Sequence, residues 1–375
     1  MKKLYRLDAW HKLLALRFKS LKWRHGVLIA LLILVTLTKM IPLWGFIYTT
    51  RIYPVIGTLL SPISGFFPFA VGDIFIALSI AWVILYPIYE IRLRKKRVFG
   101  RVAEYLLWVY AWFYIAWGLN YSQPNIYYRI GMKPVEVSKA KFKKFAYQYA
   151  DSLNALSIAS LSNARKSISP DSIVDDALKN RVRDAVLKEY NKIGYREGIN
   201  KPFNQHPHAK TMVFTPLSSM AGVTGSMGPF FCEFTLNGDI LAHDYPATYA
   251  HEFAHFLGVA NEGEANFYSY IVCTASADKQ VRFSGYYHIF FHVLNNVYDI
   301  LGEKEGERFL KHIRPEIIQR ARNDRYYWLS KRCKALDAAQ DFIFELYLKG
   351  NHVAEGRKSY SGVIGLILAW EEKKK

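Results

Sequence analysis

The first 120 residues contain three long apolar runs, whereas the rest of the chain mixes polar and apolar positions as a globular protein does. The runs cover residues 27–47, 67–89 and 102–119, and the third is the shortest. An α-helix needs about 20 residues to cross the hydrocarbon core of a bilayer. The pattern therefore predicts three N-terminal transmembrane helices.

The distribution of basic residues predicts how these helices are oriented. Eight Lys and Arg residues lie within residues 1–25, and six lie between the second and third runs. The connection between the first and second runs contains only Arg51. Because basic loops stay in the cytoplasm, we expect the N-terminus there and the chain beyond the third run on the outer face. This divides the chain into a basic cytoplasmic segment at 1–25, a three-span membrane region at 26–120 and an extracytoplasmic domain at 121–375.

Composition and charge exclude several classes of protein. Hydrophobic residues make up 51% of the chain and charged residues 22%, which rules out intrinsic disorder. Three cysteines in 375 residues rule out a disulfide scaffold, and leave open whether Cys232 pairs with Cys273 or Cys333. The net charge is +12 in residues 1–120 and +7 beyond them. Because most of the excess lies beside apolar runs, we expect contact with a lipid bilayer and none with nucleic acid.

The globular part of the sequence is typical of an α+β protein that is mostly helical. Ser138 is a candidate N-cap for a helix reaching residue 156, and a second helix is predicted over 169–193. Short strands and turns follow, with candidate strands at 211–215 and 230–236. Further helices are predicted over 246–257, 262–277, 285–302, 303–321, 335–349 and 355–370.

The residues that point to chemistry are His251-Glu252-Phe253-Ala254-His255, an HExxH pattern within a predicted helix. Two histidines four positions apart share one helix face, so both imidazoles can reach one Zn²⁺. Glu252, next to the first histidine, can hold a water molecule on the metal and take its proton. The surrounding positions are apolar, as a helix in a domain core requires, and Gly258 allows the chain to reverse after it.

A catalytic zinc needs a third protein ligand, and the acidic candidates are Glu262 and Glu264. Glu262 and Glu264 lie on opposite sides of a helix, so both cannot face one metal. Many zincin peptidases carry the third ligand as Glu with Asp or Asn four residues later, which favours Glu262 with Asn266. The other glutamate would then support the site from outside, as we expect of Asn266. A metzincin reading is disfavoured because its third ligand would fall on Asn261.

A substrate strand is also expected close to the helix. Zincins pair an extended peptide with an exposed edge strand, and residues 230–236 follow a glycine-rich stretch that would let a substrate backbone approach. Phe230, Phe231 and Glu233 are therefore candidate substrate contacts, although Glu233 could equally be a structural ion-pair partner. His288 and His292 are expected to be core residues. Candidate oxyanion donors, which the sequence does not choose between, are Tyr286, Tyr287, Tyr326, Tyr327 and Arg320.

Taken with these motifs, most of the chain resembles the bacterial membrane proteins of domain-of-unknown-function family 3810. The resemblance rests on FPFAVGD at 67–73, WGLNY at 117–121, Pro229-Phe230 with Glu233, the HExxH pattern, and EANF at 264–267. It extends to KSY at 358–360. The resemblance implies a membrane-anchored, zincin-like domain that is presumed to be a metallopeptidase. It implies no substrate.

These features together predict a zinc metallopeptidase in a bacterial cytoplasmic membrane. His251, His255 and Glu262 would bind Zn²⁺, and Glu252 would act as general base on the metal-activated water. The expected partner is a peptide or protein substrate, and the oligomeric state is left open. Two alternatives remain: a membrane scaffold that binds metal without catalysis, and a zinc amidase that acts on cell-envelope material.

Overall fold

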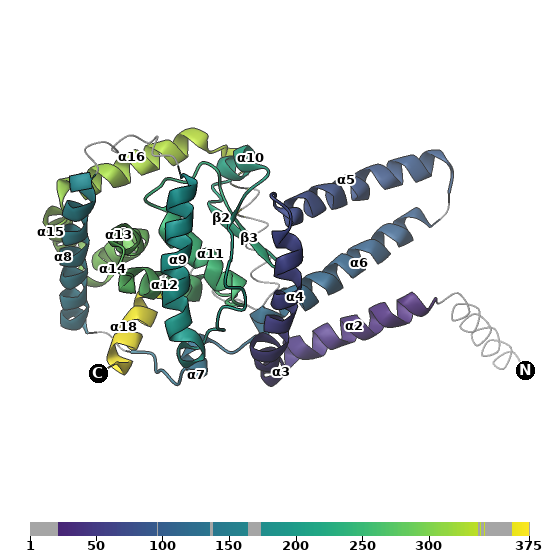
Figure 1. Cartoon of the computed structure of the whole chain (residues 1–375), viewed down its shortest axis with the longest axis horizontal. Coiled ribbons are helices and arrows are strands. Elements are labelled where there is room, and N and C mark those ends of the chain that lie inside the picture. Colours follow the sequence, from purple (N-terminus) through teal and green to yellow (C-terminus); the bar gives the residue numbers. More distant parts are fainter. Residues whose placement is uncertain are drawn as a thin grey trace, which may run out of the picture.

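The computed structural model describes residues 22–95, 97–135, 138–163, 174–336, 338, 341 and 362–374. These residues are mostly helical, with one small sheet. Figure 1 shows a globular part from which three helices, α2, α5 and α6, extend side by side in one direction. The mostly helical α+β architecture predicted from the sequence is therefore confirmed.

The three extended helices correspond to the three apolar runs. They are α2 (Trp23–Met40), α5 (Val71–Arg92) and α6 (Val98–Ala116). Among the described residues, α2 and α5 are long and apolar enough to cross a membrane, which indicates membrane association. Helix α6 lies beside both, but Arg101 and Glu104 lie in its N-terminal third. Its role as a third membrane span therefore stays a prediction.

Short helices connect the extended helices to the globular part. They are α3 (Pro42–Ile47), the π-helix η1 (Tyr48–Ile52), α4 (Tyr53–Gly65) and the 3₁₀ helix η2 (Gly118–Ser122). In Figure 1, α4 runs across the base of the extended helices. The prolines at the starts of α3 and α4 suit a first helical turn, where the missing N–H has no partner to lose. We call this set of four helices the junction.

The globular part is a helical assembly around the predicted HExxH helix. Asp175, Asn261 and Asp278 each accept a backbone N–H at a helix start, and Gly194 ends α9 with a positive φ. Its helices are α7 (Ile126–Arg129), α8 (Lys139–Asn163), α9 (Asp176–Ile193), η3 (Gly194–Glu197), α10 (Thr215–Met220), α11 (Tyr245–Phe256), α12 (Glu262–Ala275), α13 (Lys279–His288), α14 (Phe290–Leu301), α15 (Glu303–His312), α16 (Pro315–Lys331) and α18 (Val363–Lys373).

Two long predicted helices are each divided in the structure. The predicted helix 285–302 breaks at Ile289, between α13 and α14, and the helix 303–321 breaks before Pro315. Proline lacks the N–H that would continue α15, so it begins α16 instead. The predicted start at Ser169, most of the helix predicted at 335–349 and the first part of that at 355–370 lie outside the described residues, and the described part of the last is helical, as α18 (Val363–Lys373). Cys232, Cys273 and Cys333 are free thiols.

The sheet has three short strands, β1 (Lys210–Thr211), β2 (Gly225–Gly228) and β3 (Glu233–Leu236). Their order is β1-β3-β2, with β1 parallel to β3 and β2 antiparallel to it. Strand β3 is thus central and all four of its residues are buried, so the prediction of an exposed edge strand at 230–236 is wrong. The strand predicted at 211–215 is also shorter than expected, because Thr215 begins α10.

One hydrophobic core joins the globular part to the junction. Phe253 and Phe267, from α11 and α12, are fully buried at its centre. Tyr53 of α4 and Trp117 at the end of α6 belong to the same cluster. The packing therefore continues across the expected domain boundary at residue 120.

Candidate metal centre

Helix α11 places the HExxH residues inside the protein. Eleven of its twelve residues are buried, and His251 is the one that keeps partial exposure. Pro246 lies in the first turn, and after the helix Gly258 adopts a φ of 96°, which a residue with a side chain rarely tolerates. The chain reverses there, and Asn261 caps the start of α12. Glu262 is thereby brought back over the end of α11.

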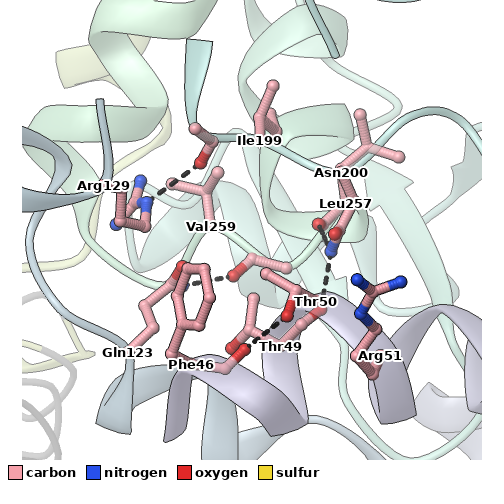
Figure 2. A pocket seen from close by; sticks show the side chains of 12 residues that line it. Phe46, Thr49, Thr50, Arg51, Gln123, Arg129, Ile199, Asn200, Leu257 and Val259 are labelled. Carbon is pink, nitrogen blue, oxygen red and sulfur yellow. Dashed lines mark hydrogen bonds between the residues drawn. The ribbon is translucent and has the colours of Figure 1, made fainter. Parts of the chain in front are cut away.

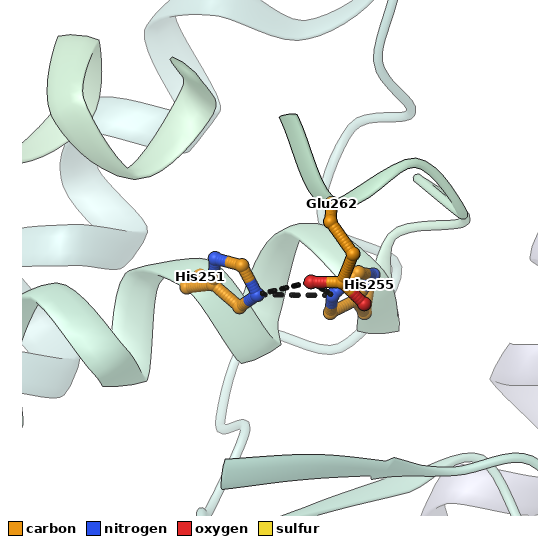
Figure 3. A group of neighbouring side chains, drawn as sticks. All are labelled: His251, His255 and Glu262. Atoms are coloured by element: carbon orange, nitrogen blue, oxygen red, sulfur yellow. Dashed lines mark hydrogen bonds and ion pairs between the residues drawn. The ribbon is translucent and has the colours of Figure 1, made fainter. Parts of the chain in front are cut away.

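Three side chains meet at one point in Figure 3. The distance between His251 Nε2 and His255 Nε2 is 3.1 Å. Glu262 Oε2 lies 3.2 Å from His251 Nε2 and 3.5 Å from His255 Nε2. Ligands about 2.0–2.1 Å from a tetrahedral zinc ion are roughly 3.3 Å apart. The three separations fit the edges of such a tetrahedron, so the donor set and its spacing suit Zn²⁺.

The surroundings of the histidines favour this arrangement. His255 Nδ1 donates a hydrogen bond to the carbonyl of Val259 at 2.6 Å, which orients Nε2 toward the cluster. Burial disfavours charge on His255, but the Glu262 carboxylate outweighs it and raises the pKa of His255 to about 9. Burial opposes ionisation of Glu262 too, yet His255 and His251 lower its pKa well below the usual range. The cluster thus favours a cation beside this carboxylate.

Glu252 is buried beside the cluster but is not part of it. Its exposed fraction is 5%, and its Oε2 has no hydrogen-bond partner among the described residues. Burial raises the pKa of Glu252. An unpaired buried carboxylate oxygen is costly unless a ligand or a water molecule serves it. This is the environment that a general base for a metal-activated water requires.

A glycine of β2 makes room for this carboxylate. A Cβ atom on Gly225 would lie 2.4 Å from Glu252 Oε1, which is closer than non-bonded atoms approach. Strand β2 is an edge of the described sheet and packs against α11. The strand beside the candidate site is therefore β2, not the predicted 230–236.

Comparison with known proteins gives one match. The model of a family described as a protein of unknown function (DUF3810) matches residues 48–368. The chain belongs to this family. The match contains the junction from Tyr48 onward, helices α5 and α6, and all of the candidate metal centre. No curated protein and no solved structure gives a significant match.

The other acidic candidate in this DUF3810 chain has a different partner. Glu264 forms a buried ion pair with Arg129, with Nη2 and Oε2 2.6 Å apart, and accepts the N–H of Ile126 at 2.9 Å. Both carboxylate oxygens are therefore engaged away from the histidines. Asn266, predicted to support a ligand, accepts from His288 Nε2 at 2.9 Å.

His288 lies between Asn266 and His251, where the sequence had predicted only a core residue. Its ring centroid lies 6.0 Å from that of His251. Burial and the neighbouring His251 lower the pKa of His288 to about 3, so the ring is neutral. His251 Nδ1 itself has no hydrogen-bond partner within the described part of the chain. No local pattern marks His288, because α13 reaches His251 only through the packing of α11, α12 and α13.

The predicted substrate contacts lie elsewhere. Phe230 and Phe231 form the turn between β2 and β3, and both rings pack on Phe75 of α5. Glu233 is buried, pairs with Lys210 at 2.7 Å and accepts the N–H of Gly72. Phe230, Phe231 and Glu233 therefore contact α5 and connect it to the sheet. The structural ion-pair interpretation of Glu233 is the correct one.

Three of the five candidate oxyanion donors have partners away from the cluster. Tyr287 donates to Asp324, Tyr327 donates to the carbonyl of Asp239, and Arg320 lies over the ring of Phe283. A second group, His243 with Asp244 and Asp324, has donor atoms close enough to hold an ion. Asp324 in that group already accepts from His243 and Tyr287.

The end of α11 is held by side chains from the junction and its neighbours. Trp117 Nε1 donates to the carbonyl of His255 at 3.0 Å, and Tyr53 donates to that of Phe256 at 2.7 Å. Asn200 and Gln123 donate to the carbonyls of Leu257 and Gly258. The last carbonyls of a helix have no partner within it. Here the His255 carbonyl also accepts the Gly258 N–H at 3.0 Å, and the side-chain donors come largely from residues adjoining the extended helices.

Proposed function

We propose that this chain is a membrane-anchored zinc metallopeptidase. The observation that carries the proposal is the convergence of two imidazole nitrogens and one carboxylate oxygen at 3.1–3.5 Å. His251, His255 and Glu262 would hold the ion. Three protein ligands would leave a fourth position for water, as in catalytic zinc sites.

The residues beside the centre fit hydrolysis of a peptide bond. A bound zinc ion would lower the pKa of a water molecule and polarise the scissile carbonyl. Glu252, whose Oε2 has no protein partner in the described residues, would accept the proton of that water. Its raised pKa then suits transfer of the proton to the leaving amine. Glu252 serves as the base and does not bind the metal.

An extended substrate would pair with β2. This strand is an edge of the described sheet, and Gly225 brings its backbone against Glu252. Backbone hydrogen bonds between an edge strand and a peptide give affinity without demanding a particular side chain. A peptide on β2 would therefore pass close to the base.

The topology that we propose has three membrane spans, α2, α5 and α6. The basic residues at 92–101 connect α5 to α6 and stay in the cytoplasm under the positive-inside rule. The globular part then lies at the opposite ends of these helices, on the outer face of a bacterial cytoplasmic membrane. Its substrates would be peptides or exposed protein segments on that face.

Metal content and turnover of the full-length chain in detergent test this proposal. We expect about one zinc per folded chain by elemental analysis, lost in His251→Ala and strongly reduced in Glu262→Gln. Glu264→Gln is the matched control, because it makes the same change two residues along, and its folded fraction should keep the metal. Loss in Glu264→Gln with retention in Glu262→Gln, or no zinc in the reconstituted wild type, would contradict the assignment.

Glu252→Gln separates a peptidase from a metal-binding scaffold. The variant should keep zinc and lose cleavage of an unstructured peptide library by at least about 10²-fold, as expected when a general base is removed. If Glu252→Gln supports the same cellular role as the wild type, the scaffold alternative holds. Turnover of cell-envelope amides with no cleavage of peptides would favour the amidase instead.

A further inference from the structure

Strand β2 runs from the candidate metal centre to the first turn of α5. At its first residue, Gly225, a Cβ atom would meet the Glu252 carboxylate. Its last residue, Gly228, lies beside α5, because a Cβ atom on Gly72 would be 4.0 Å from the Gly228 Cα. The first and last Cα atoms of a four-residue strand are about 10 Å apart. The proposed base is therefore only the length of β2 away from the start of α5.

The turn that follows β2 is fixed to both α5 and α6. Phe230 and Phe231 pack on Phe75 of α5, with ring centroids 4.9 and 5.6 Å from that of Phe75. The carbonyl of Phe230 accepts a hydrogen bond from Trp112 Nε1 of α6 at 3.0 Å. Side-chain packing, and not a linker, therefore sets the position of β2 relative to these two helices.

The exposed side chains of α5 and α6 mark where the bilayer begins. Asp73 is polar and lies in the first turn of α5, whereas exposed apolar side chains along α5 begin at Ile76, one residue after Phe75. On α6, Tyr110 and Trp112 are 44% and 39% exposed. Tyr and Trp are enriched where a membrane protein crosses the membrane–water interface. In the proposed topology, the turn between β2 and β3 therefore lies at the level of the outer interface.

The segment that precedes α5 favours the same level. Phe66, Phe67 and Phe69 form a chain of ring contacts and have exposed fractions of 85%, 38% and 43%. Lys210 Nζ of β1 donates to the carbonyl of Phe69 at 3.0 Å, which joins this segment to the sheet. Exposed apolar patches of this kind mark surfaces that contact a membrane or another protein. The end of the sheet beside α5 thus adjoins a surface suited to the lipid interface.

The metal centre is also joined to the junction. Asn200 Nδ2 donates to the carbonyl of Thr49 in η1 and to that of Leu257 after α11, both at 2.9 Å. Figure 2 shows Asn200 between η1 and the loop that follows α11, beside a cavity that both line. Helices α8 and α15 lie on the opposite side of the globular part in Figure 1. The centre is therefore at the end of the globular part that adjoins the extended helices.

The open edge of β2 has backbone groups available to a substrate. In an antiparallel pair, hydrogen-bonded residues alternate with residues whose N–H and C=O point away from the partner strand. Asn237 donates its N–H to the Thr224 carbonyl, so these two form a hydrogen-bonded pair. Gly225, which is opposite Leu236, is then a position that points away, and Met227 is the next. Both direct their N–H and C=O to the edge that no described strand occupies.

We propose that the substrates are polypeptides anchored in the same membrane, cleaved within a few residues of its surface. This inference rests on the proposed function and names the substrate class of that site. A segment paired with Gly225 and Met227 would run from the base, past Gly228, to the level at which α5 enters the bilayer. About three residues would separate its scissile bond from the interface, because each residue of a strand covers about 3.4 Å.

The depth of β2 can be measured without zinc and without turnover. Ser226, the exposed residue of β2, is replaced by Cys in a full-length Cys333→Ser chain, labelled with a fluorophore and placed in phosphatidylcholine vesicles. Cys232 and Cys273 are buried and should stay unlabelled. Lipids with a nitroxide headgroup should quench the label at position 226. Glu307→Cys is the matched control, because Glu307 is exposed on the distant helix α15, and its label should keep its fluorescence. Equal fluorescence loss at the two positions overturns the proposal.

Turnover in the same vesicles compares anchored with free substrates. The most rapidly cleaved peptide of the library is tested free, joined to an apolar transmembrane helix through four residues, and joined through twenty residues. Sharing a membrane raises the effective concentration of the partners, so the four-residue form should be cleaved at least about tenfold faster than the free peptide. It should also be cleaved no more slowly than the twenty-residue form, because the site is close to the membrane.

Each other result contradicts a stated part of this inference. Equal cleavage of the free and four-residue forms overturns the substrate class, and cleavage of the twenty-residue form alone places the site far from the membrane. No cleavage of any form contradicts the proposed function itself. Absence of quenching at Ser226, in contrast, contradicts the substrate class and leaves the peptidase function standing.

Met227→Pro tests whether the substrate pairs with β2. Proline removes the N–H that points to the open edge and none that bonds to β3, as edge strands tolerate. Loss of one hydrogen bond to the substrate should slow cleavage of the four-residue form about fivefold. Met227→Ala is the control, because it shortens the same side chain and keeps the N–H. Equal rates in the two variants, at equal zinc content, overturn the pairing with β2.

Discussion

Two glutamates only two positions apart have different surroundings in this protein. Glu262 faces His251 and His255, whereas Glu264 faces Arg129. The sequence separated them correctly in principle, because positions two apart lie on different sides of a helix. The sequence could not predict that Glu264 pairs with Arg129, which is 135 residues away along the chain. Only the fold brings that charge to α12.

Gly225 offers a test of the base that leaves the metal ligands untouched. Gly225→Ala places a methyl group 2.4 Å from Glu252 Oε1, so the carboxylate must move. A displacement of about 1 Å in an active site can cost about 10²-fold in rate. We expect zinc content to be kept and peptide cleavage to fall by roughly that factor.

Ser226→Ala is the control for this substitution, because Ser226 is the exposed neighbour on the same strand. It should leave cleavage within about twofold of the wild type, the range expected of a surface change. If Gly225→Ala cleaves as fast as Ser226→Ala, the contact between β2 and Glu252 has no part in catalysis.

At the scale of elements, the residues that start or end a helix predicted the helices that they flank. Pro246 and Gly258 flank the HExxH helix, and the observed α11 (Tyr245–Phe256) differs from the predicted 246–257 by one residue at each end. The edge strand was predicted wrongly because alternation identifies a strand but not its neighbours. The strand that became the edge, Gly225–Gly228, has two glycines and a weak strand signal.

The carbonyls at the C-terminal end of α11 accept hydrogen bonds from side chains that are distant in sequence, and no pattern near the helix predicts these donors. Trp117→Phe keeps an aromatic ring but removes the N–H that serves the His255 carbonyl. The carbonyl keeps the Gly258 N–H as a donor at 3.0 Å, so the substitution loses one buried hydrogen bond, which is worth about 0.5–1.5 kcal/mol. The free energy of unfolding in detergent should fall by that amount, and zinc affinity should fall with it, because the carbonyl belongs to a proposed ligand.

Trp112→Phe is the matched comparison. It removes an N–H that donates to the Phe230 carbonyl at 3.0 Å, but the Trp112 side chain is exposed. Because this bond lies where α6 meets the globular part, water or a detergent headgroup can replace the donor, so stability and zinc affinity should change little. Equal effects of the two substitutions would mean that the contact of Trp117 with α11 has no special importance.

At the scale of the whole molecule, the hydrophobic pattern and the core divide the chain differently. The apolar runs end near residue 120, so the sequence suggested a membrane region followed by a separate domain. The core, however, includes Tyr48, Tyr53 and Trp117 together with Phe253. A pattern along the chain shows where apolar residues are, whereas the structure shows that some of them face protein and not lipid.

The isolated segment 121–375 should therefore not fold as an independent domain. Without the junction and α6, this segment lacks Tyr53 and Trp117, which donate hydrogen bonds to the end of α11. The apolar surface on which both rings pack would then be exposed. Losing two large buried aromatic side chains costs about 3–5 kcal/mol each, which is comparable to the total stability of many domains. We expect the segment to aggregate, to lack a cooperative thermal transition and to bind less than one zinc per chain.

The full-length chain, purified in the same detergent, should unfold cooperatively. A cooperative transition with one zinc bound in residues 121–375 would mean that the junction only anchors the protein. The opposite result would mean that the segments beside the proposed membrane spans hold the HExxH helix in place.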